Sequence, residues 1–384
     1  MEIVSTFSNA KVNIGNNHIA SNGIDTCHIY MPGGRQDHQR RSVHMLDINA
    51  KHIWDKYVYS SDLASCYHLS GWKSVIERSF AHKTFYLYAE DENGQVCGIL
   101  PLVNLKSLLF GNFIISMPYF NYGGICASDN ETFSQLMDAA IDIAVKQNAA
   151  HIELRHSWPV SFPMPVKTAK VAMHLQLPSN TDDLWKSLPS KLRSQVRRPL
   201  KDNMTAIVGG EELLDEFYSV FSENMRDLGT PVYGKSFFAN IMQEFPSVSK
   251  ICIVRTKEGI AATAGFLIGF KKTMEIPWAS SLKKYNRLSP NMLLYWTVLQ
   301  YACENGYNVF DFGRSTPGEG TYKFKEQWGA RPVQLYWHYW MRNNGTMPEL
   351  NPHNPKYEAA IKIWKKLPIT LTNLIGPSIV KNLP

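Results

Sequence analysis

The sequence lacks closely spaced cysteines, which removes two common ways of stabilising or using a protein. None of its six cysteines belongs to a CxxC pair, and they are spread along the chain as Cys27, Cys66, Cys97, Cys126, Cys252 and Cys303. Zinc sites and secreted disulfide scaffolds both depend on cysteines at short, regular spacing. We therefore expect neither of them, and we expect a reducing compartment.

Long hydrophobic runs are absent as well. No uninterrupted apolar stretch approaches the roughly 20 residues that a membrane-spanning helix requires. The first residues, MEIVSTFSNAKVNIGNNH, contain no basic segment followed by an apolar one, which is the pattern of a signal peptide. These two observations predict a cytoplasmic protein.

A strong charge of either sign is also missing. The formal net charge is only +7, and 44% hydrophobic with 19% charged residues is ordinary for a globular protein. A mild positive excess suits an anionic small molecule, an acidic lipid surface or a tRNA backbone, but it falls short of a DNA-binding signature. We therefore expect no DNA partner.

The twelve histidines are scattered and suggest no metal centre. His151 and His156 flank one expected strand, and because they are five residues apart they face opposite sides of it. Two such side chains do not share a metal ion easily, so we predict no metal site.

The 384 residues fit two domains of about 150 residues each rather than one core. Residues 1–42 are polar and show no apolar periodicity, so we expect a flexible lead-in there. The first half then predicts a helix over 61–80 with a break at Gly71, a hairpin over 84–103, a strand over 113–117, a helix over 131–147 and a strand over 151–156. The second half predicts helices over 211–227 and 236–245, a hairpin over 251–270, a strand over 274–280, a helix over 291–304 and a strand over 308–313.

The two halves align on each other at a constant offset of about 158 residues, which indicates a duplicated domain. Residues 142–157 match residues 300–315, and Glu153 falls on Asp311. The repeated order of hairpin, strand, helix and strand is that of a GNAT domain. We therefore expect an α/β (α+β) fold of tandem GNAT-like domains, each a mixed, mainly antiparallel sheet flanked by helices. Their expected bounds are 43–175 and 176–345, followed by a C-terminal tail over 346–384.

Four segments carry a more specific resemblance: PYFNYGG at 118–124, residues 188–201, residues 311–330 and residues 354–368. Together they resemble the FemAB family of double-GNAT transferases, whose best-known members add amino acids to peptidoglycan precursors. More narrowly, they resemble the FemAB-like proteins associated with exopolysaccharide and PEP-CTERM/exosortase gene clusters.

The segment from Asp311 to Ala330 is the most informative of the four. A strand ends at Asp311, Arg314 and Ser315 follow it, and a Gly-rich turn leads to a short helix, an arrangement that presents polar groups to ligands in α/β folds. Phe324 and Lys325, followed by Trp328-Gly329, resemble the FK-aromatic-Gly motif of FemAB transferases. In that family the matching lysine lies near the transferred group or the acceptor phosphates. The resemblance implies that Lys325 stabilises an oxyanion, whereas its neighbours Lys323 and Glu326 leave open a solvated helix face.

The second constellation is the basic segment SKLRSQVRRPLK. Arg193 and Arg197 are four residues apart, so on a helix they point the same way and form a fork for phosphate or carboxylate. Pro199 is expected to end or kink this helix. In FemAB enzymes the region approaches a nucleotide-sugar or lipid-pyrophosphate acceptor, while an exposed basic helix remains the alternative.

The third constellation is the loop around Asn121, Tyr122 and Gly123. The first two side chains can bond polar ligand groups, and glycine permits close backbone approach. Bridge-forming members of the family carry Arg-Gly-Pro here with an aspartate shortly after, whereas this chain has Asn-Tyr-Gly-Gly and only the poorly matched Asp129. The departure argues against a peptidoglycan acceptor.

The general base is left open between three carboxylates. Asp311 lies at a strand end, Glu319 lies on the following loop, and Glu153 has only the duplicated position in its favour. Asp311 has a structural alternative, which is to cap the turn that follows it.

The donor is left open between acyl-CoA and aminoacyl-tRNA. Acetyl-CoA-dependent GNAT domains bind pyrophosphate on a Q/R-x-x-G-x-G/A loop, and the corresponding residues 282–294 contain no glycine. This absence favours a donor other than CoA in the usual pose, and we expect no tightly bound cofactor.

We predict an acyl or aminoacyl transferase that modifies an amine on a surface-polysaccharide or cell-wall precursor by direct nucleophilic attack. Its partners would be a small-molecule or lipid-linked saccharide acceptor and, for one donor, tRNA. The tail from 357 to 384 mixes apolar residues with lysines, so it either touches the inner membrane face or packs on the second domain. A catalytically silent double-GNAT scaffold in exopolysaccharide assembly is the alternative.

Overall fold

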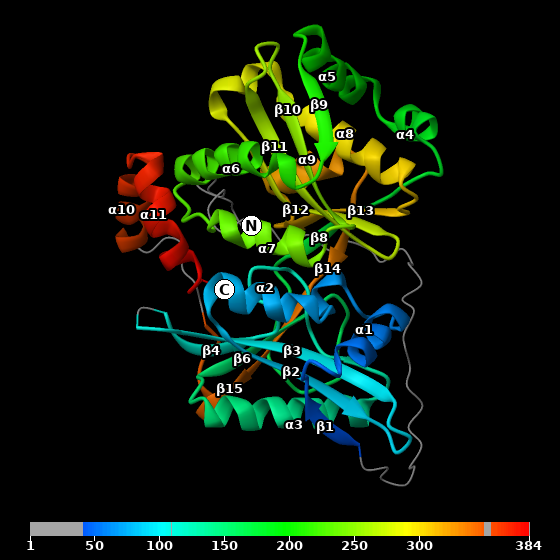
Figure 1. Cartoon of the computed structure of the whole chain (residues 1–384), viewed down its shortest axis with the longest axis vertical. Coiled ribbons are helices and arrows are strands. Elements are labelled where there is room, and N and C mark those ends of the chain that lie inside the picture. Colours follow the sequence, from blue (N-terminus) through cyan, green and yellow to red (C-terminus); the bar gives the residue numbers. More distant parts are fainter. Residues whose placement is uncertain (1–40, 109, 349–354, 384) are drawn as a thin grey trace, which may run out of the picture.

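The computed structural model describes residues 41–108, 110–348 and 355–383. The lead-in expected over residues 1–42 therefore lies almost wholly outside the described residues. The described chain forms two sheets, one above the other, with helices on both faces of each (Figure 1).

The first sheet has the strand order β1-β2-β3-β4-β6-β15-β7, and the short β5 pairs with β3. Helix α3 covers one face, and α1 and α2 cover the face that is turned toward the second half (Figure 1). The strands are β1 (Ser42–Met45), β2 (Lys83–Glu90), β3 (Val96–Ser107), β4 (Gly111–Ile115), β5 (Cys126–Ala127), β6 (His151–His156), β7 (Val166–Lys167) and β15 (Tyr336–Met341). The helices are α1 (Lys51–Ser60), the 3-10 helix η1 (Cys66–His68), α2 (Gly71–Phe80) and α3 (Asn130–Lys146).

The second sheet has the order β14-β8-β13-β12-β11-β10-β9. Its strands are β8 (Val171–Gln176), β9 (Thr205–Gly209), β10 (Ser249–Arg255), β11 (Ala261–Phe270), β12 (Thr273–Ser281), β13 (Val309–Ser315) and β14 (Arg331–Gln334). Its helices are α4 (Thr181–Ser187), α5 (Ser190–Lys201), η2 (Glu211–Leu213), α6 (Leu214–Leu228), α7 (Lys235–Glu244), η3 (Lys283–Leu288), α8 (Pro290–Glu304) and α9 (Gly320–Glu326). A last 3-10 turn, η4 (Arg342–Asn344), follows β15.

The two sheets repeat one pattern of pairing, so the expected tandem GNAT fold is confirmed. In each sheet a hairpin leads to a strand that pairs in parallel with the strand after the helix, β4 with β6 and β12 with β13. Glu153 is the partner of Ile115 in one parallel pair, and Asp311 is the partner of Glu275 in the other. These two acids therefore occupy equivalent places, as the 158-residue offset predicts.

The sheets also exchange strands across the division expected from the sequence. β8 lies at the end of the expected first domain but pairs with β13 and β14 of the second sheet. β15 lies in the expected second domain but pairs with β6 and β7 of the first sheet. Each half therefore supplies a strand to the other.

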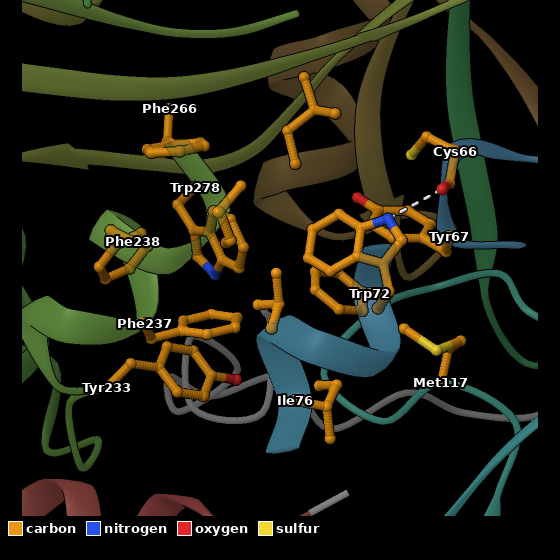
Figure 2. Packing of buried hydrophobic residues seen from close by; sticks show 14 of the residues in the cluster. Cys66, Tyr67, Trp72, Ile76, Met117, Tyr233, Phe237, Phe238, Phe266 and Trp278 are labelled. Carbon is orange, nitrogen blue, oxygen red and sulfur yellow. Dashed lines mark hydrogen bonds between the residues drawn. The ribbon is translucent and has the colours of Figure 1, made fainter. Parts of the chain in front are cut away.

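Close packing of α2 against α7 joins the two halves in one core. Figure 2 shows Trp72 and Tyr67 of the first half beside the aromatic side chains of the second, among them Phe237 and Trp278. Gly71 is the first residue of α2 rather than a break inside a longer helix, and a Cβ there would lie 2.7 Å from Glu244 Cγ on α7. Glycine at this position allows the close approach of the two helices.

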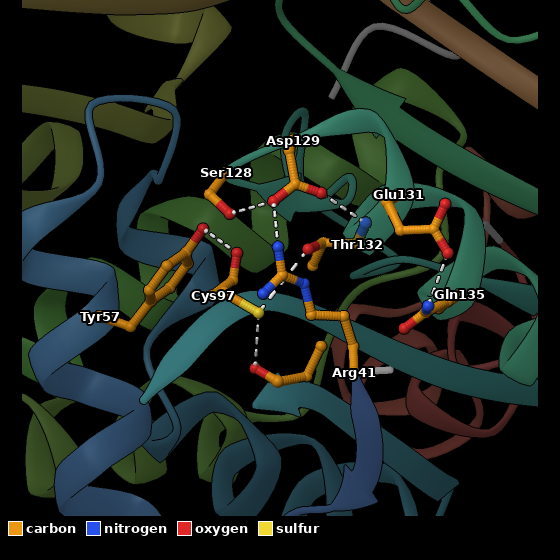
Figure 3. Close-up of polar contacts among 9 residues, drawn as sticks. Arg41, Tyr57, Cys97, Ser128, Asp129, Glu131, Thr132 and Gln135 are labelled. Atoms are coloured by element: carbon orange, nitrogen blue, oxygen red, sulfur yellow. Dashed lines mark hydrogen bonds and ion pairs between the residues drawn. The ribbon is translucent and has the colours of Figure 1, made fainter. Parts of the chain in front are cut away.

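Asp129 has a structural role at the start of α3. Its carboxylate accepts a hydrogen bond from the Thr132 backbone N–H at 2.7 Å, as an N-cap residue does, and it forms an ion pair with Arg41 at 3.1 Å (Figure 3). The Ser128 hydroxyl donates to it as well, at 2.9 Å. These contacts account for the aspartate that follows the 118–124 loop.

The C-terminal tail packs on the second half, which was one of its two expected placements. Its helices are α10 (Pro355–Trp364) and α11 (Ile369–Val380), and α11 contacts α6. Arg226 of α6 donates to the Leu367 carbonyl at 3.1 Å, and Tyr119 of the first half donates to the Lys381 carbonyl at 2.7 Å. In the described part of the chain, no helix has the length and hydrophobicity to cross a membrane.

Candidate active site

A buried polar cluster lies on the face of the second sheet that meets the first half. Along β12 and β13, the side chains of Met274 and Phe310 point into the core under α8, so Glu275 and Asp311 point the opposite way. Both acids are almost fully buried, with 5% and 2% of their surface exposed. Two carboxylates side by side on adjacent strands require partners from other elements.

Asp311 is satisfied on both of its oxygens. The Gly313 N–H donates to Oδ1 at 2.7 Å, so the expected capping of the next turn is present. The hydroxyl of Tyr122, which belongs to the first half, donates to Oδ2 at 2.6 Å. Nε2 of His174, on the exchanged strand β8, lies 3.3 Å from the same oxygen.

The pKa values of the two acids are shifted in opposite directions. Burial raises the pKa of Glu275 well above its usual range, and the neighbouring charge of Asp311 raises it further. Burial also acts to raise the pKa of Asp311, but His174 and the hydrogen bonds to the carboxylate outweigh it, and the pKa of Asp311 is lowered. Burial and the Asp311 charge thus favour the protonated form of Glu275, whose carboxyl group accepts a hydrogen bond from the Tyr67 hydroxyl at 2.8 Å.

His174 is the member of the cluster that reaches the surface, with 27% of its side chain exposed. Burial lowers the pKa of this histidine, but the Asp311 charge and hydrogen bond raise it by more, so the net pKa is above the ordinary value. A histidine held by a buried carboxylate can take up a proton and keep it close to a ligand.

Lys325 lies against the end of β13, so the alternative of a solvated helix face does not hold for it. α9 begins at Gly320 and turns this side chain inward, leaving 8% of the residue exposed, while Lys323 and Glu326 face solvent. Its ammonium donates to the carbonyls of Gly313 at 3.1 Å and Arg314 at 2.8 Å. The amine is therefore fixed beside the loop that follows Asp311.

The 118–124 loop of the first half meets this loop of the second. Asn121 lies close to Gly313, because a Cβ on that glycine would be 4.0 Å from the Asn121 amide nitrogen. Gly123 has a φ of +142°, and a Cβ there would lie 2.7 Å from the Met117 side chain. Glycine is thus required for the path that brings Asn121 and Tyr122 to the second sheet.

Trp337 of β15 connects Arg314 to the same loop. Its indole N–H donates to the Asn121 carbonyl at 3.3 Å. The guanidinium of Arg314 lies 4.8 Å from the ring centre of Trp337, and that of Arg155 lies 4.3 Å from it. The exchanged strand β15 therefore takes part in the site, as β8 does.

Glu153, the third candidate base, belongs to a buried network in the first sheet. Its oxygens accept from Arg155 Nε at 2.7 Å and from the Tyr339 hydroxyl at 2.8 Å. Arg155 in turn donates to the Phe120 carbonyl at 2.6 Å. Glu153 thus supports the loop that carries Tyr122, and no contact among the described residues joins it to Lys325.

Replacing Glu153 by glutamine is expected to lower the free energy of unfolding by about 3–5 kcal/mol at neutral pH, because Arg155 would keep a buried charge without its counterion. The Arg155 charge and the hydrogen bonds outweigh burial and lower the pKa of Glu153, so its stabilisation is present above the ordinary value of 4.5 and is lost as the pH falls through the lower folded pKa. Denaturant titrations should show the difference from wild type shrinking below that pH. The exposed Glu304→Gln is the matched control, and an equal loss for both would contradict this role.

Arg193 and Arg197 do not join the cluster. Both lie on α5, which packs on α8, and the Arg197 guanidinium lies 5.1 Å from the Trp185 ring centre. Within the described residues, neither arginine contacts Asp311 or Lys325. α5 also runs through Pro199 to Lys201 instead of ending there, which a proline near the last turn allows.

The remaining candidates take separate places. Glu319 is the N-cap residue of α9 but makes no side-chain capping bond, and Ser315 is fully buried at the end of β13 with no hydrogen-bond partner for its hydroxyl. Phe324 packs with its ring 5.0 Å from that of Tyr295. It lines a cavity of about 190 Å³ between the end of β12, the start of α8 and α9.

The segment that lacks glycine folds as η3 and leads into α8. Ser289 adopts the left-handed φ of 57° directly before Pro290, a conformation that glycine adopts most easily. The side chains in this turn therefore hinder the close approach of a pyrophosphate to the backbone N–H groups, which a glycine loop would leave accessible.

Three residues of the cluster were not predicted from the sequence: Glu275, His174 and Tyr67. The strand segment MEIPWAS contains Glu275 as its single charge between apolar neighbours, which is the one local sign of a buried polar group. Among the described residues, no group of three or more histidines, cysteines and acids could hold a metal ion.

This architecture is the tandem GNAT fold, in which two related mixed sheets are flanked by helices. A family model described as an acetyltransferase (GNAT) domain matches residues 190–326. The match covers most of the second half, including Asp311 and Lys325.

Three solved structures with the same fold are similar to this chain. The chain is similar to FemX, with 16% identity, a TM-score of 0.60, and 78% of this chain and 98% of that chain covered. It is similar to the C-terminal domain of a putative lysylphosphatidylglycerol synthetase from Agrobacterium fabrum, with 13% identity, a TM-score of 0.52 and coverage of 83% and 95%. It is also similar to a tandem GNAT protein from the clavulanic acid biosynthesis pathway, with 11% identity, a TM-score of 0.52 and coverage of 80% and 100%.

No curated protein matches the sequence significantly. The likeness to FemX agrees in fold with the expected FemAB resemblance, whereas the narrower exosortase-associated group stays a prediction.

Proposed function

We propose that this protein transfers an acyl or aminoacyl group to an amine, at the place where the 118–124 loop meets the end of β13. The observation that carries this proposal is the contact of Tyr122 with Asp311 at 2.6 Å, beside the Lys325 ammonium held by the Gly313 and Arg314 carbonyls. This contact brings Tyr122 of the first half next to Asp311 and Lys325 of the second half, around Gly313.

Lys325 stabilises the oxyanion in this mechanism. The carbonyls of Gly313 and Arg314 orient its ammonium, and the positive charge acts on a carbonyl oxygen that becomes negative during attack. The site is partly shielded, since Lys325 and Gly313 are both buried, and shielding strengthens such an interaction. No covalent enzyme intermediate is needed.

His174, held by Asp311, takes the proton of the attacking amine. Asp311 is buried and its oxygens are engaged, so it acts through the more exposed histidine. With Nε2 facing the carboxylate, Nδ1 accepts the proton, and Asp311 stabilises the imidazolium. The N–C bond forms, the ester C–O or thioester C–S bond breaks, and the proton passes from His174 to the leaving oxygen or sulfur.

For the substrates, we propose an amine on a surface-polysaccharide or cell-wall precursor as the acceptor. Aminoacyl-tRNA is favoured over acyl-CoA as the donor, because the turn before α8 has side chains where CoA-binding loops have glycine. A FemX structure and a putative lysylphosphatidylglycerol synthetase share the fold, which supports aminoacyl transfer without deciding it.

Ligand-dependent thermal stability tests the donor. A ligand at 100 times its Kd stabilises the folded state by about 2.7 kcal/mol, which is a clear shift in the melting curve. We expect such a shift with an aminoacyl-tRNA and none with CoA or acetyl-CoA. A comparable shift with acetyl-CoA would overturn the donor assignment and leave the transferase proposal in place.

Mass spectrometry of surface glycans tests the transferase itself. Cells without the protein should lack a modified amine, and wild-type protein should restore it whereas Lys325→Met should not. Full restoration by Lys325→Met would instead support a scaffold that binds without catalysing.

A further inference from the structure

The C-terminal helical hairpin presents an apolar surface with lysines around it. We call the exposed side chains of Lys362, Ile363, Lys365, Lys366, Leu371 and Leu374 the tail surface. The three apolar members are strongly exposed, at 63% for Ile363, 39% for Leu371 and 75% for Leu374. Leu371 and Leu374 are three residues apart on α11, so they form an adjacent exposed pair on one side of the helix rather than scattered single residues.

The orientation of this surface is set by the buried side of the same hairpin. Thr372, Gly376 and Val380 recur every four residues on α11 and are buried, so they form the stripe that faces the body of the protein. A Cβ at Gly376 would lie 3.0 Å from the Val232 backbone nitrogen, which shows how closely α11 approaches the second half. Leu371 and Leu374, three residues apart, therefore stay on the outside.

The charge of the hairpin has one dominant sign. Between residues 358 and 383 there are four lysines and a single acid, Glu358. A further lysine adjoins it, because Lys283 of η3 donates to the Asp227 carbonyl at 3.2 Å, and the same end of α6 receives Ile361 against Gly229. Lys283 thus lies next to the hairpin, while the nearby Lys284 and Arg226 are paired with Glu223 and Asp227.

We propose that the tail surface binds the surface of an anionic lipid bilayer. Leucine and isoleucine side chains enter the boundary between headgroups and acyl chains, and the lysines around them pair with lipid phosphates. A second copy of this chain fits less well, because a two-fold contact through this surface would set lysines against lysines. This docking does not depend on the proposed chemistry.

Co-sedimentation with vesicles tests the proposal on the full chain. The protein should bind vesicles of phosphatidylcholine mixed with phosphatidylglycerol. Its binding should be about 10-fold weaker to vesicles of phosphatidylcholine alone, and also about 10-fold weaker to the mixed vesicles at high salt. The double variant Leu371→Ser/Leu374→Ser should lose about 10-fold in binding, and Lys362→Gln/Lys365→Gln/Lys366→Gln should lose at least as much. These substitutions lie on exposed positions, so the melting temperature should not change.

Helix α5 offers a matched control because it is basic and also exposes a leucine. The variant Lys191→Gln/Arg198→Gln/Leu200→Ser removes similar charge and a side chain that is 50% exposed. It should bind vesicles as wild type does. If this variant loses binding and the tail variants keep it, the membrane surface lies on α5 and the proposal is wrong.

Three other outcomes are decisive as well. Absence of binding to anionic vesicles, or equal binding to neutral ones, would overturn the proposal. A dimer in solution that Leu374→Ser converts to a monomer would assign the surface to a second copy. The Lys325→Met variant should bind vesicles fully, which separates failure of docking from failure of the proposed reaction.

Discussion

Replacing Lys325 by methionine is expected to lower kcat by about 10²–10³-fold, with little change in KM. Methionine keeps the length and apolar stem of the side chain but removes the charge that faces the reacting carbonyl. The KM should hold because the loss concerns the oxyanion, which exists only in the transition state. Single-turnover transfer to an amine acceptor, followed by mass spectrometry, measures the effect.

Two variants distinguish this role from a structural one. Lys325 also donates to the Gly313 and Arg314 carbonyls, so its removal should cost about 1–3 kcal/mol of stability, which denaturant titration reports separately. Lys325→Arg should recover part of kcat, since the charge returns. Lys323→Ala, on the exposed side of the same helix, should behave as wild type. Equal activity of Lys325→Met and wild type would refute the assignment.

Much of the fold could be predicted because it depends on local patterns. Hairpins, amphipathic helices and the constant offset between the halves are visible in one sequence, and the offset alone predicts equivalent positions for Glu153 and Asp311. The exchange of β8 and β15 could not be predicted, because strand pairing across more than a hundred residues leaves no local signature.

The candidate site was predicted only where a motif pointed to it. Lys325 was predicted from its resemblance to a family motif. Its charged neighbours suggested a solvated helix face, because its burial depends on the packing of α9 against β13, which has no local sequence signal. Arg193 and Arg197 were expected near the substrate from their charge and from the family resemblance, and the structure places them on α5, which packs on α8 and not beside Asp311. Charge patterns identify a basic surface without saying what it faces.

His174 was missed because its function depends on the strand exchange. Nothing in VAMHLQ marks a functional histidine, and its importance arises when β8 pairs with β13 and brings His174 to Asp311. The other exchanged strand, β15, brings Trp337 to Arg314. The exchange thus ties the halves together and assembles the site from both, so the site should be lost if the halves are expressed separately.

The Asp311→Asn variant is expected to lower the pKa of His174. Burial lowers this pKa and the Asp311 charge raises it, so without the charge only the lowering effect remains. The neutral histidine is the base, so the rate falls as the pH drops through this pKa. In the variant this acid limb should shift to lower pH. At its optimum, kcat should fall by about 10²-fold, because the imidazolium loses its counterion.

NMR titration of the His174 ring measures the pKa without any substrate, and the pH profile of kcat measures its consequence. The same acceptor amine serves both proteins, so its own ionisation cancels in the comparison. Glu275→Gln is the matched control: the pKa of His174 is raised by Asp311 and not by Glu275, so it should stay where it is in this variant. His174→Gln should lose a similar factor in kcat and lack the acid limb. If Asp311→Asn and Glu275→Gln shift the His174 pKa equally, Asp311 is not its partner, and the proton must leave the amine by another route.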